Sequence, residues 1–167
     1  NNWHQTDIQR ADWQEVTMPT LWSTFNKEIE PGAIWLHKSF ELDKKYLNKK
    51  CRLFLGCIVD ADSVYVNGVF VGSTAYQYPP RKYEIPSSLL KEGSNEITIR
   101  VIDQNGVGGM VEDKVYGLIF PEGDTIHLEG KWLYKVGTSL PKINSQVFIQ
   151  WKSNAIYNTM ITPLFHF

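Results

Sequence analysis

Apolar and polar residues alternate with a period of two along much of the chain. The alternating segments are 51–59, 63–67, 95–103 and 132–136. In the first of them, Cys51, Leu53, Leu55, Cys57 and Val59 would share one face of a strand. This period is typical of strands with one buried face, so the sequence predicts antiparallel sheets.

A further segment, from Ile34 to Leu42, alternates less regularly. Leu36 and Phe40 continue the apolar face of Ile34, but Lys38 interrupts it. An extra residue in one strand of a pair shifts the side chains that follow it to the other face. We therefore expect a β-bulge near Lys38.

Turn residues separate these segments. Asn67-Gly68 lies between two valine-rich runs and predicts a hairpin with a type I′ turn. A segment that begins at Pro86 and ends before Gly93 predicts about one helical turn. Further breaks fall at 43–49, 123–124 and 129–130. Many short strands without long helices predict an all-β fold, a β-sandwich or jelly roll.

The pattern changes near Pro141. Beyond it, Ile156, Met160 and Leu164 recur every four residues, which predicts a helix that Ser153 or Asn154 would cap. A short helix has little to pack against in a sandwich, so we expect the start of another domain. The predicted organisation is a sandwich over 1–140 and a linker with a truncated second domain over 141–167.

Composition narrows the classes of function. The 167 residues carry 17 Lys plus Arg and 18 Asp plus Glu, a formal net charge of −1. Nucleic acids and anionic membranes attract basic surfaces, so neither is an expected partner. The first residues, Asn1-Asn2-Trp3, show neither an initiator Met nor a signal-peptide pattern, so we expect a piece of a larger protein.

The two cysteines, Cys51 and Cys57, are expected to be free. In one strand they would lie about 20 Å apart at ~3.3 Å per residue. A disulfide joins Cα atoms within roughly 7 Å. Free thiols leave a periplasmic or secreted location open.

Candidate binding residues gather in the predicted loops. If each strand reverses the one before it, the segments 19–33, 60–62, 75–81 and 104–116 lie at one end of the sandwich. Aromatic rings there would stack on sugars and charged groups would bind their hydroxyls. The alternative is that the aromatic rings close the end of the core and the acids are solvated. The carbohydrate-binding or cleft-facing candidates are Trp22, Asp60, Asp62, Tyr76, Tyr78, Arg81, Asp103, Glu112 and Tyr116.

Catalytic and metal motifs are absent from the sequence. It has no Gly-x-Ser-x-Gly elbow, no Cys-x-x-Cys pair and no His-x-x-x-His pair. Asp124 and His127 have the Asp-x-x-His spacing of Gly-Asp-Ser esterases, but without the serine block we interpret the match as chance. We therefore expect no catalytic residue, no metal site and no cofactor in this chain.

Four segments resemble the sugar-binding domain of family 2 glycoside hydrolases, and they are 12–19, 32–40, 62–72 and 89–101. In that family a Val-Tyr-Val-Asn-Gly hairpin precedes a Leu-Leu-Lys-Glu-Gly-x-Asn turn, as it does here from Val64 and from Leu89. The resemblance implies a galactose-binding-like jelly roll.

A narrower resemblance is to the β-sandwich inserted in sialate O-acetylesterases, carried by 81–86, 103–109, 124–137 and 155–164. It implies that the last segment re-enters an α/β esterase domain of the SGNH type. The catalytic Ser and His of that domain would lie outside this chain. It also implies a bacterial protein in the periplasm or outside the cell.

We therefore expect a non-catalytic accessory domain of a larger carbohydrate esterase that removes O-acetyl groups from sialic acid or related sugars. Its partners would be the esterase domain of the same chain and a glycan. The alternatives are an independent carbohydrate-binding module, the sugar-binding domain of a family 2 glycoside hydrolase, or a structural spacer. A shared fold does not separate these roles.

Overall fold

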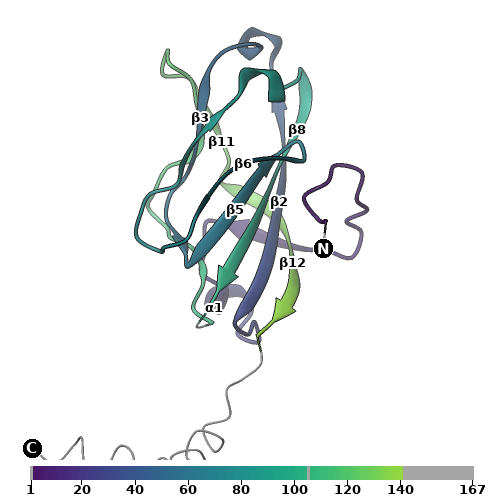
Figure 1. Ribbon diagram of the computed structural model, residues 1–167, viewed down its shortest axis with the longest axis vertical. Helices are drawn as coiled ribbons and strands as arrows, with labels where there is room; N and C mark the ends of the chain where they lie inside the picture. The colour runs from purple at the N-terminus through teal and green to yellow at the C-terminus, as the bar shows by residue number, and fades with distance from the viewer. Residues whose placement is uncertain (1, 105, 141–167) are drawn as a thin grey trace, which may run out of the picture.

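Two antiparallel sheets pack face to face in the computed structural model, which describes residues 2–104 and 106–140 (Figure 1). The larger sheet has the strand order β1-β12-β2-β8-β5-β6, the smaller one β11-β10-β3-β7, and β4 pairs with β9. The strands are β1 (Gln14–Met18), β2 (Gly32–Leu42), β3 (Cys51–Leu55), β4 (Ile58–Val59), β5 (Ala61–Val66), β6 (Val69–Thr74), β7 (Lys82–Ile85), β8 (Gly93–Asp103), β9 (Gly109–Met110), β10 (Tyr116–Ile119), β11 (Thr125–His127) and β12 (Gly130–Ser139). The predicted all-β sandwich is confirmed.

The helices among the described residues are short. They are α1 (Trp22–Phe25) and two 3₁₀ turns, Lys44–Tyr46 and Ser87–Leu89. The second of these turns confirms the helical turn expected after Pro86. None of the helices in the described ranges has the length and apolar character needed to cross a bilayer. The predicted helix after Ser153, like the whole segment 141–167, lies outside the described residues.

The core lies between the sheets and follows the predicted alternation. On β5, Val64 and Val66 are fully buried, and on β8 the same holds for Ile97, Ile99 and Val101. The smaller sheet meets them with alternate residues of β3, β7 and β10. Removing apolar surface from water on both inner faces is the main force that holds the sheets together.

The predicted hairpin joins β5 to β6. Asn67 and Gly68 both have positive φ, 46° and 81°, as a type I′ turn requires. The Asn67 amide donates to Oδ1 of Asn95 (2.8 Å) and to the Leu89 carbonyl (2.7 Å), and its Oδ1 accepts from the Glu96 N–H (2.9 Å). The asparagines of the two family motifs thus contact each other and fasten the hairpin to β8.

The strand predicted over 51–59 is interrupted. Gly56, with φ of 52°, ends β3, and the chain resumes as β4. The alternation shifts there, so Ile58 is buried while Cys57 and Val59 are half-buried. The prediction of one continuous face is therefore wrong beyond Leu55. Both cysteines are free, as expected.

The bulge expected at Lys38 is absent. β2 pairs with β8 in one continuous register, and Lys38 lies opposite Ile97. Its ammonium group donates to the carbonyls of Glu129 (3.3 Å) and Lys131 (2.9 Å), and lies 5.7 Å from the Trp132 ring centroid. A lysine can cover apolar surface with its stem while its charge reaches polar groups at the edge, so no change of register is needed.

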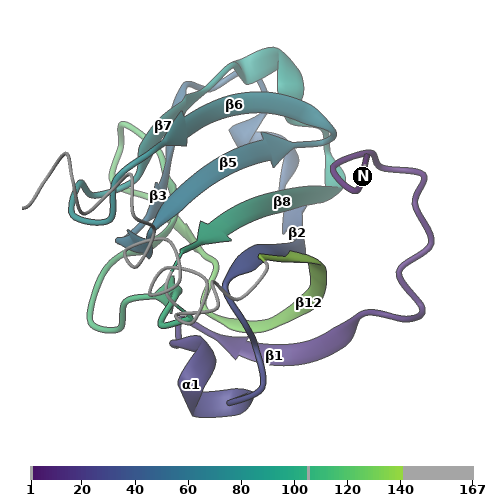
Figure 2. The ribbon, with the colours of Figure 1, turned by 60° about the horizontal axis from the view of Figure 1, so that its bottom comes forward.

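Both faces of β2 are covered, which explains its irregular pattern. Ala33 to His37 are all buried. The inner face contacts the core, whereas the outer face carries Trp35 and His37 against residues of the amino-terminal segment 2–13. Trp3 meets Trp35 at 6.0 Å between ring centroids, and Trp13 meets His37 at 6.3 Å. In Figures 1 and 2 this segment runs beside the larger sheet.

On β12 the predicted inward face ends early. Trp132 and Tyr134 are buried, but Val136 is 39% exposed. The pairing of β12 with β2 shifts register between Val136 and Thr138. The prediction that one buried face runs through the whole segment 132–136 is therefore wrong at Val136.

The predicted gathering of loops at one end is confirmed. Segments 19–31, 56–60, 75–81, Gln104 and 106–115 all lie where β2 and β5 begin and β3 and β8 end, since Gly32 pairs with Asp103 and Ala61 with Ile102. We call this the loop end, and Figure 2 turns it toward the viewer with α1 in front. Asn67-Gly68 lies at the opposite end of β5.

Candidate functional site

Backbone hydrogen bonds tie the segments of the loop end together. The Arg81 N–H donates to the Gly56 carbonyl (2.7 Å), and the Val111 N–H donates to that of Cys57 (3.0 Å). The Trp22 N–H donates to the Gly108 carbonyl (2.9 Å). Segments far apart in the sequence therefore form one connected surface.

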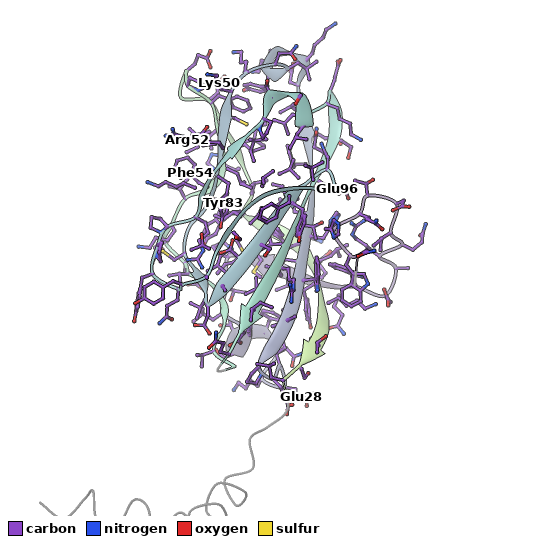
Figure 3. All side chains as sticks on the ribbon, in the orientation of Figure 1. Glu28, Lys50, Arg52, Phe54, Tyr83 and Glu96 are labelled. Carbon is purple, nitrogen blue, oxygen red and sulfur yellow. The ribbon has the colours of Figure 1, made fainter. Side chains whose placement is uncertain are left out.

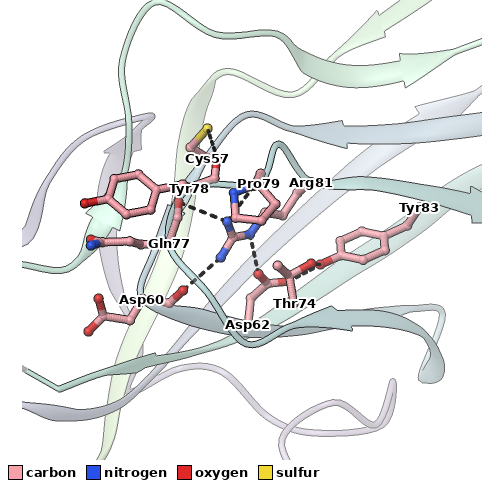
Figure 4. Close-up of polar contacts among 9 residues, drawn as sticks. All are labelled: Cys57, Asp60, Asp62, Thr74, Gln77, Tyr78, Pro79, Arg81 and Tyr83. Atoms are coloured by element: carbon pink, nitrogen blue, oxygen red, sulfur yellow. Dashed lines mark hydrogen bonds and ion pairs between the residues drawn. The ribbon is translucent and has the colours of Figure 1, made fainter.

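Arg81 organises this surface from inside. Its side chain is fully shielded from solvent, and its Nε donates to Oδ1 of Asp62 over 2.6 Å. The remaining nitrogens donate to three backbone carbonyls, those of Gln77 (3.2 Å), Pro79 (2.7 Å) and Asp60 (2.9 Å) (Figure 4). A planar guanidinium with five donors suits such a set of acceptors, and the loop 75–81 is fixed by it.

Tyr83 and Thr74 complete the network. The Tyr83 hydroxyl donates to Oδ2 of Asp62 (2.5 Å) and lies 2.9 Å from Oγ1 of Thr74 (Figure 4). Burial, followed by the hydrogen bond to Asp62, raises the pKa of Tyr83, so the phenol stays protonated and can donate. Burial also raises the pKa of Asp62, against the lowering effect of Tyr83 and Arg81. Both oxygens of Asp62 are thus engaged.

Two further acids of the loop end bind backbone N–H groups. Oδ2 of Asp60 accepts from Gln104 (3.0 Å). Oδ1 of Asp103 accepts from Gly106 (2.8 Å), and its Oδ2 accepts from Gly108 (2.9 Å). Asp103 is fully buried, and it gives the glycine-rich loop a fixed shape.

The predicted candidates divide by exposure. Trp22 and Tyr116 are buried in the core, and the Tyr116 hydroxyl donates to the Val111 carbonyl (2.6 Å). Burial raises the pKa of Tyr116. Asp62, Arg81 and Asp103 are buried in the networks above. These five therefore support the loop end, and direct sugar contact stays a prediction for the others, which are Asp60, Tyr76, Tyr78 and Glu112.

Tyr76 and Tyr78 form the exposed aromatic pair of the loop end. They are 58% and 67% exposed, and their rings meet edge to face with centroids 5.1 Å apart. The loop that carries them is held by Arg81, and the Tyr78 carbonyl also accepts from the Cys57 thiol (3.6 Å). Exposed aromatic rings on a fixed loop suit the apolar faces of sugars.

Neither a metal cluster nor a joined Asp-x-x-His pair is found among the residues that the structure describes. Within 2–104 and 106–140, no three His, Cys, Asp or Glu side chains gather as a metal site would require. Asp124 accepts from the Tyr46 hydroxyl (3.1 Å), whereas the largely exposed His127 lies 3.4 Å from Glu129. These two residues of the Asp-x-x-His match thus have separate partners.

Sequence reasoning missed Tyr83 and Thr74 as members of the network. Tyr83 alternates with Lys82 and Glu84 on β7, so the pattern could have placed it on the inner face. Thr74 lies opposite Asp62 only because the β5–β6 pairing shifts register between Val64 and Tyr65. No sequence signal marks that shift.

Comparison with known proteins places these features in a family. Residues 1–136 match the model of the sugar-binding domain of glycosyl hydrolases family 2. A β-galactosidase of Thermoanaerobacter pseudethanolicus is 27% identical over 131 residues, which cover 75% of this chain and 16% of that protein. The chain thus spans about a sixth of this relative.

Solved structures show the same fold. β-Glucuronidase 2 of Bacteroides uniformis, as a calcium-binding mutant, superposes with a TM-score of 0.58 at 18% identity, over 80% of this chain and 16% of that one. The β-glucuronidase of Ruminococcus gnavus gives 0.52 at 19% identity, over 81% and 25%. These relatives are glycosidases, so they support the broader resemblance and not the narrower one to sialate O-acetylesterases.

Proposed function

Because the chain belongs to the sugar-binding domains of glycosyl hydrolases family 2, we propose that it serves a larger β-glycosidase that acts on β-galactosides or β-glucuronides. In this proposal the loop end contributes to substrate binding beside the catalytic domain of the same protein. The accessory role expected from the sequence is retained, with a glycosidase in place of the esterase.

The exposed pair Tyr76 and Tyr78 carries this proposal. Both rings lie on a loop that a buried arginine fixes, so binding a sugar would cost little ordering of the protein. Aromatic rings of this kind contact the C–H faces of sugars. Asp60 and Glu112 belong to the same end, where carboxylates can bind sugar hydroxyls.

The same geometry supports a non-catalytic role. Glycoside hydrolysis needs one carboxylic acid that gives a proton and a second carboxylate that acts as base or nucleophile. At the loop end, Asp62 is engaged by Arg81 and Tyr83, and Asp103 by two backbone N–H groups. Neither Asp62 nor Asp103 is available to a substrate, and in this proposal Asp60 and Glu112 bind sugar hydroxyls. We therefore place the catalytic pair in another part of the larger protein.

The test uses the full-length protein with nitrophenyl β-galactoside and nitrophenyl β-glucuronide. Tyr76→Ala and Tyr78→Ala should raise KM severalfold for the substrate that is hydrolysed, with kcat and melting temperature little changed. Phe70→Ala is the matched control, because Phe70 is a 55% exposed aromatic residue near the opposite hairpin. An unchanged KM in both tyrosine variants would assign the loop end to a spacer role.

A further inference from the structure

A depression lies on the outer face of the larger sheet, outside the loop end. Its volume is about 370 Å³, which falls in the range of small-molecule sites. Strands β12, β2, β8 and β5 and the amino-terminal segment form it, and the four strands are neighbours in the larger sheet (Figures 1 and 2). The side chains that line it include Asn2, His4, Trp35, Tyr65, Arg100 and Thr138.

The register of the sheet places three of these side chains on one face. Trp35 of β2 lies directly opposite Arg100 of β8, and Arg100 lies opposite Ser63 of β5. Residues paired in this way share a face of the sheet, and Tyr65 is two positions beyond Ser63 on the same face. Arg100 therefore stands on the strand between those of Trp35 and Tyr65.

The aromatic rings of the depression are held in place. Tyr65 and Trp35 lie 23° from parallel with centroids 6.3 Å apart, and His4 stacks on Tyr65 at 4.5 Å. Trp35 is only 5% exposed, and Trp3 packs on it in a T-shaped contact. The rings thus form fixed walls, with the polar side chains of Asn2 and Thr138 beside them.

The depression carries a positive charge, that of Arg100, which no acidic residue of the described lining compensates. The sequence has four arginines, and three contact carboxylates: Arg10 that of Glu96, Arg52 that of Glu84 and Arg81 that of Asp62. Arg100 has no ion pair or hydrogen bond with any described residue, and none of the residues lining the depression is acidic. A guanidinium in this position matches the two oxygens of a carboxylate or sulfate group.

We propose that this depression is a binding site for an anionic sugar, a uronic acid or a sulfated hexose. Arg100 pairs with the acidic group, the aromatic walls contact the ring, and Asn2 and Thr138 bind hydroxyls. The site goes beyond the proposed function, because it lies on a sheet face rather than at the loop end and needs no residue of the catalytic domain. It would hold the protein to an acidic glycan.

The test measures binding to the 167-residue chain by titration calorimetry. The probes are methyl β-glucuronide, galactose 6-sulfate and neutral methyl β-glucoside. At least one of the two anionic sugars should bind at least tenfold more tightly than the neutral sugar. Comparing the glucuronide with the sulfate shows which acidic group the site prefers. Arg100→Gln should weaken that binding at least tenfold, and Arg100→Lys, which keeps the charge without the fork, should weaken it less.

A control variant distinguishes binding in this depression from binding to any exposed arginine of the domain. Arg52→Gln removes an exposed arginine of β3 and should leave the affinity for the anionic sugars unchanged. Figure 3 shows Arg52 on the opposite side of the molecule from Glu96, which shares its face of β8 with Arg100. The loop-end proposal is tested separately, by KM of the full-length protein, so its failure would leave the effect of Arg100→Gln on this binding unaltered. The proposal is overturned by equal affinity for neutral and anionic sugars, by absence of binding, or by full affinity in a folded Arg100→Gln variant.

Discussion

Arg81 Nε lies 2.6 Å from Oδ1 of Asp62, and neither side chain exposes any surface to solvent. The pair joins the loop that carries Tyr76 and Tyr78 to strand β5. A buried charge is tolerated when its partner and further hydrogen bonds compensate it, and here three backbone carbonyls do so as well. The exposed tyrosines therefore depend on an ion pair that they do not contact.

Removing the arginine should destabilise the whole domain. Arg81→Met leaves the carboxylate of Asp62 buried without its charge partner and frees three carbonyls, which should lower the free energy of unfolding by about 3–5 kcal/mol. Urea unfolding of the chain measures it. Arg52→Met, which breaks the exposed pair with Glu84, should change it by no more than about 1 kcal/mol. Equal effects of the two variants would contradict the structural role of Arg81.

The hairpin asparagine can be tested without disturbing its turn. Asn67→Gly retains a residue that accepts positive φ but removes the hydrogen bonds to Leu89, Asn95 and Glu96. We expect a loss of about 1–3 kcal/mol in unfolding free energy, since the buried Asn95 also loses a partner. A loss near zero would mean that the turn alone, and not its link to β8, stabilises this region.

Gly108 should tolerate no side chain. A Cβ there would lie 2.3 Å from Trp22 Nε1 and 2.7 Å from Asp103 Oδ2, so the loop would have to move. Gly108→Ala should lower the melting temperature more than Gly123→Ala does. Gly123 has a φ of 94° with no neighbour within 4 Å, so its variant meets only the conformational cost, roughly 1–2 kcal/mol. Thermal unfolding measures the melting temperature of both variants. A smaller decrease for Gly108→Ala than for Gly123→Ala would show that the loop moves to accept the methyl group.

Stability should fall in acid because of His37. Burial, with a smaller effect of Arg10, lowers the pKa of His37 from 6.5 to about 4. Between these values the unfolded chain binds the proton and the folded chain does not, so stability decreases as the pH falls from 6.5 to 4. Between pH 6.5 and pH 4 the loss in unfolding free energy is about 2–3 kcal/mol.

A variant isolates this contribution from that of Glu96, whose pKa is raised by burial and which lies 3.6 Å from His37 Nε2. In His37→Gln, the difference in unfolding free energy between pH 6.5 and pH 4 should be about 2–3 kcal/mol smaller than in the unsubstituted chain. Denaturant unfolding at the two values measures it. An unchanged pH dependence would show that His37 is protonated in the folded state.

The predictable part of the fold is the part that local pattern determines. Val64, Val66 and the Asn67-Gly68 turn specify β5, its buried face and its hairpin within a few residues. The failures come from contacts between distant segments. Trp3 and Trp13 bury the outer face of β2, which no alternation within that strand could reveal.

The sequence predicts where the loop end lies, but not which of its candidate residues are buried and which are exposed. Strand reversal located the segments correctly, because antiparallel topology leaves few alternatives. Asp62, Arg81 and Asp103 have the residue types of a binding site, yet the structure buries them in internal hydrogen bonds. Burial depends on the packing of all four segments, and residue type alone does not report it.

The most direct test compares two activities of the full-length protein. Purified protein is assayed for hydrolysis of nitrophenyl β-galactoside and β-glucuronide, and for acetate release from O-acetylated sialic acid. We predict hydrolysis of a β-glycoside without acetate release, as for a family 2 glycosidase that carries this domain. Acetate release without hydrolysis of either glycoside would contradict the proposed function and restore the esterase interpretation.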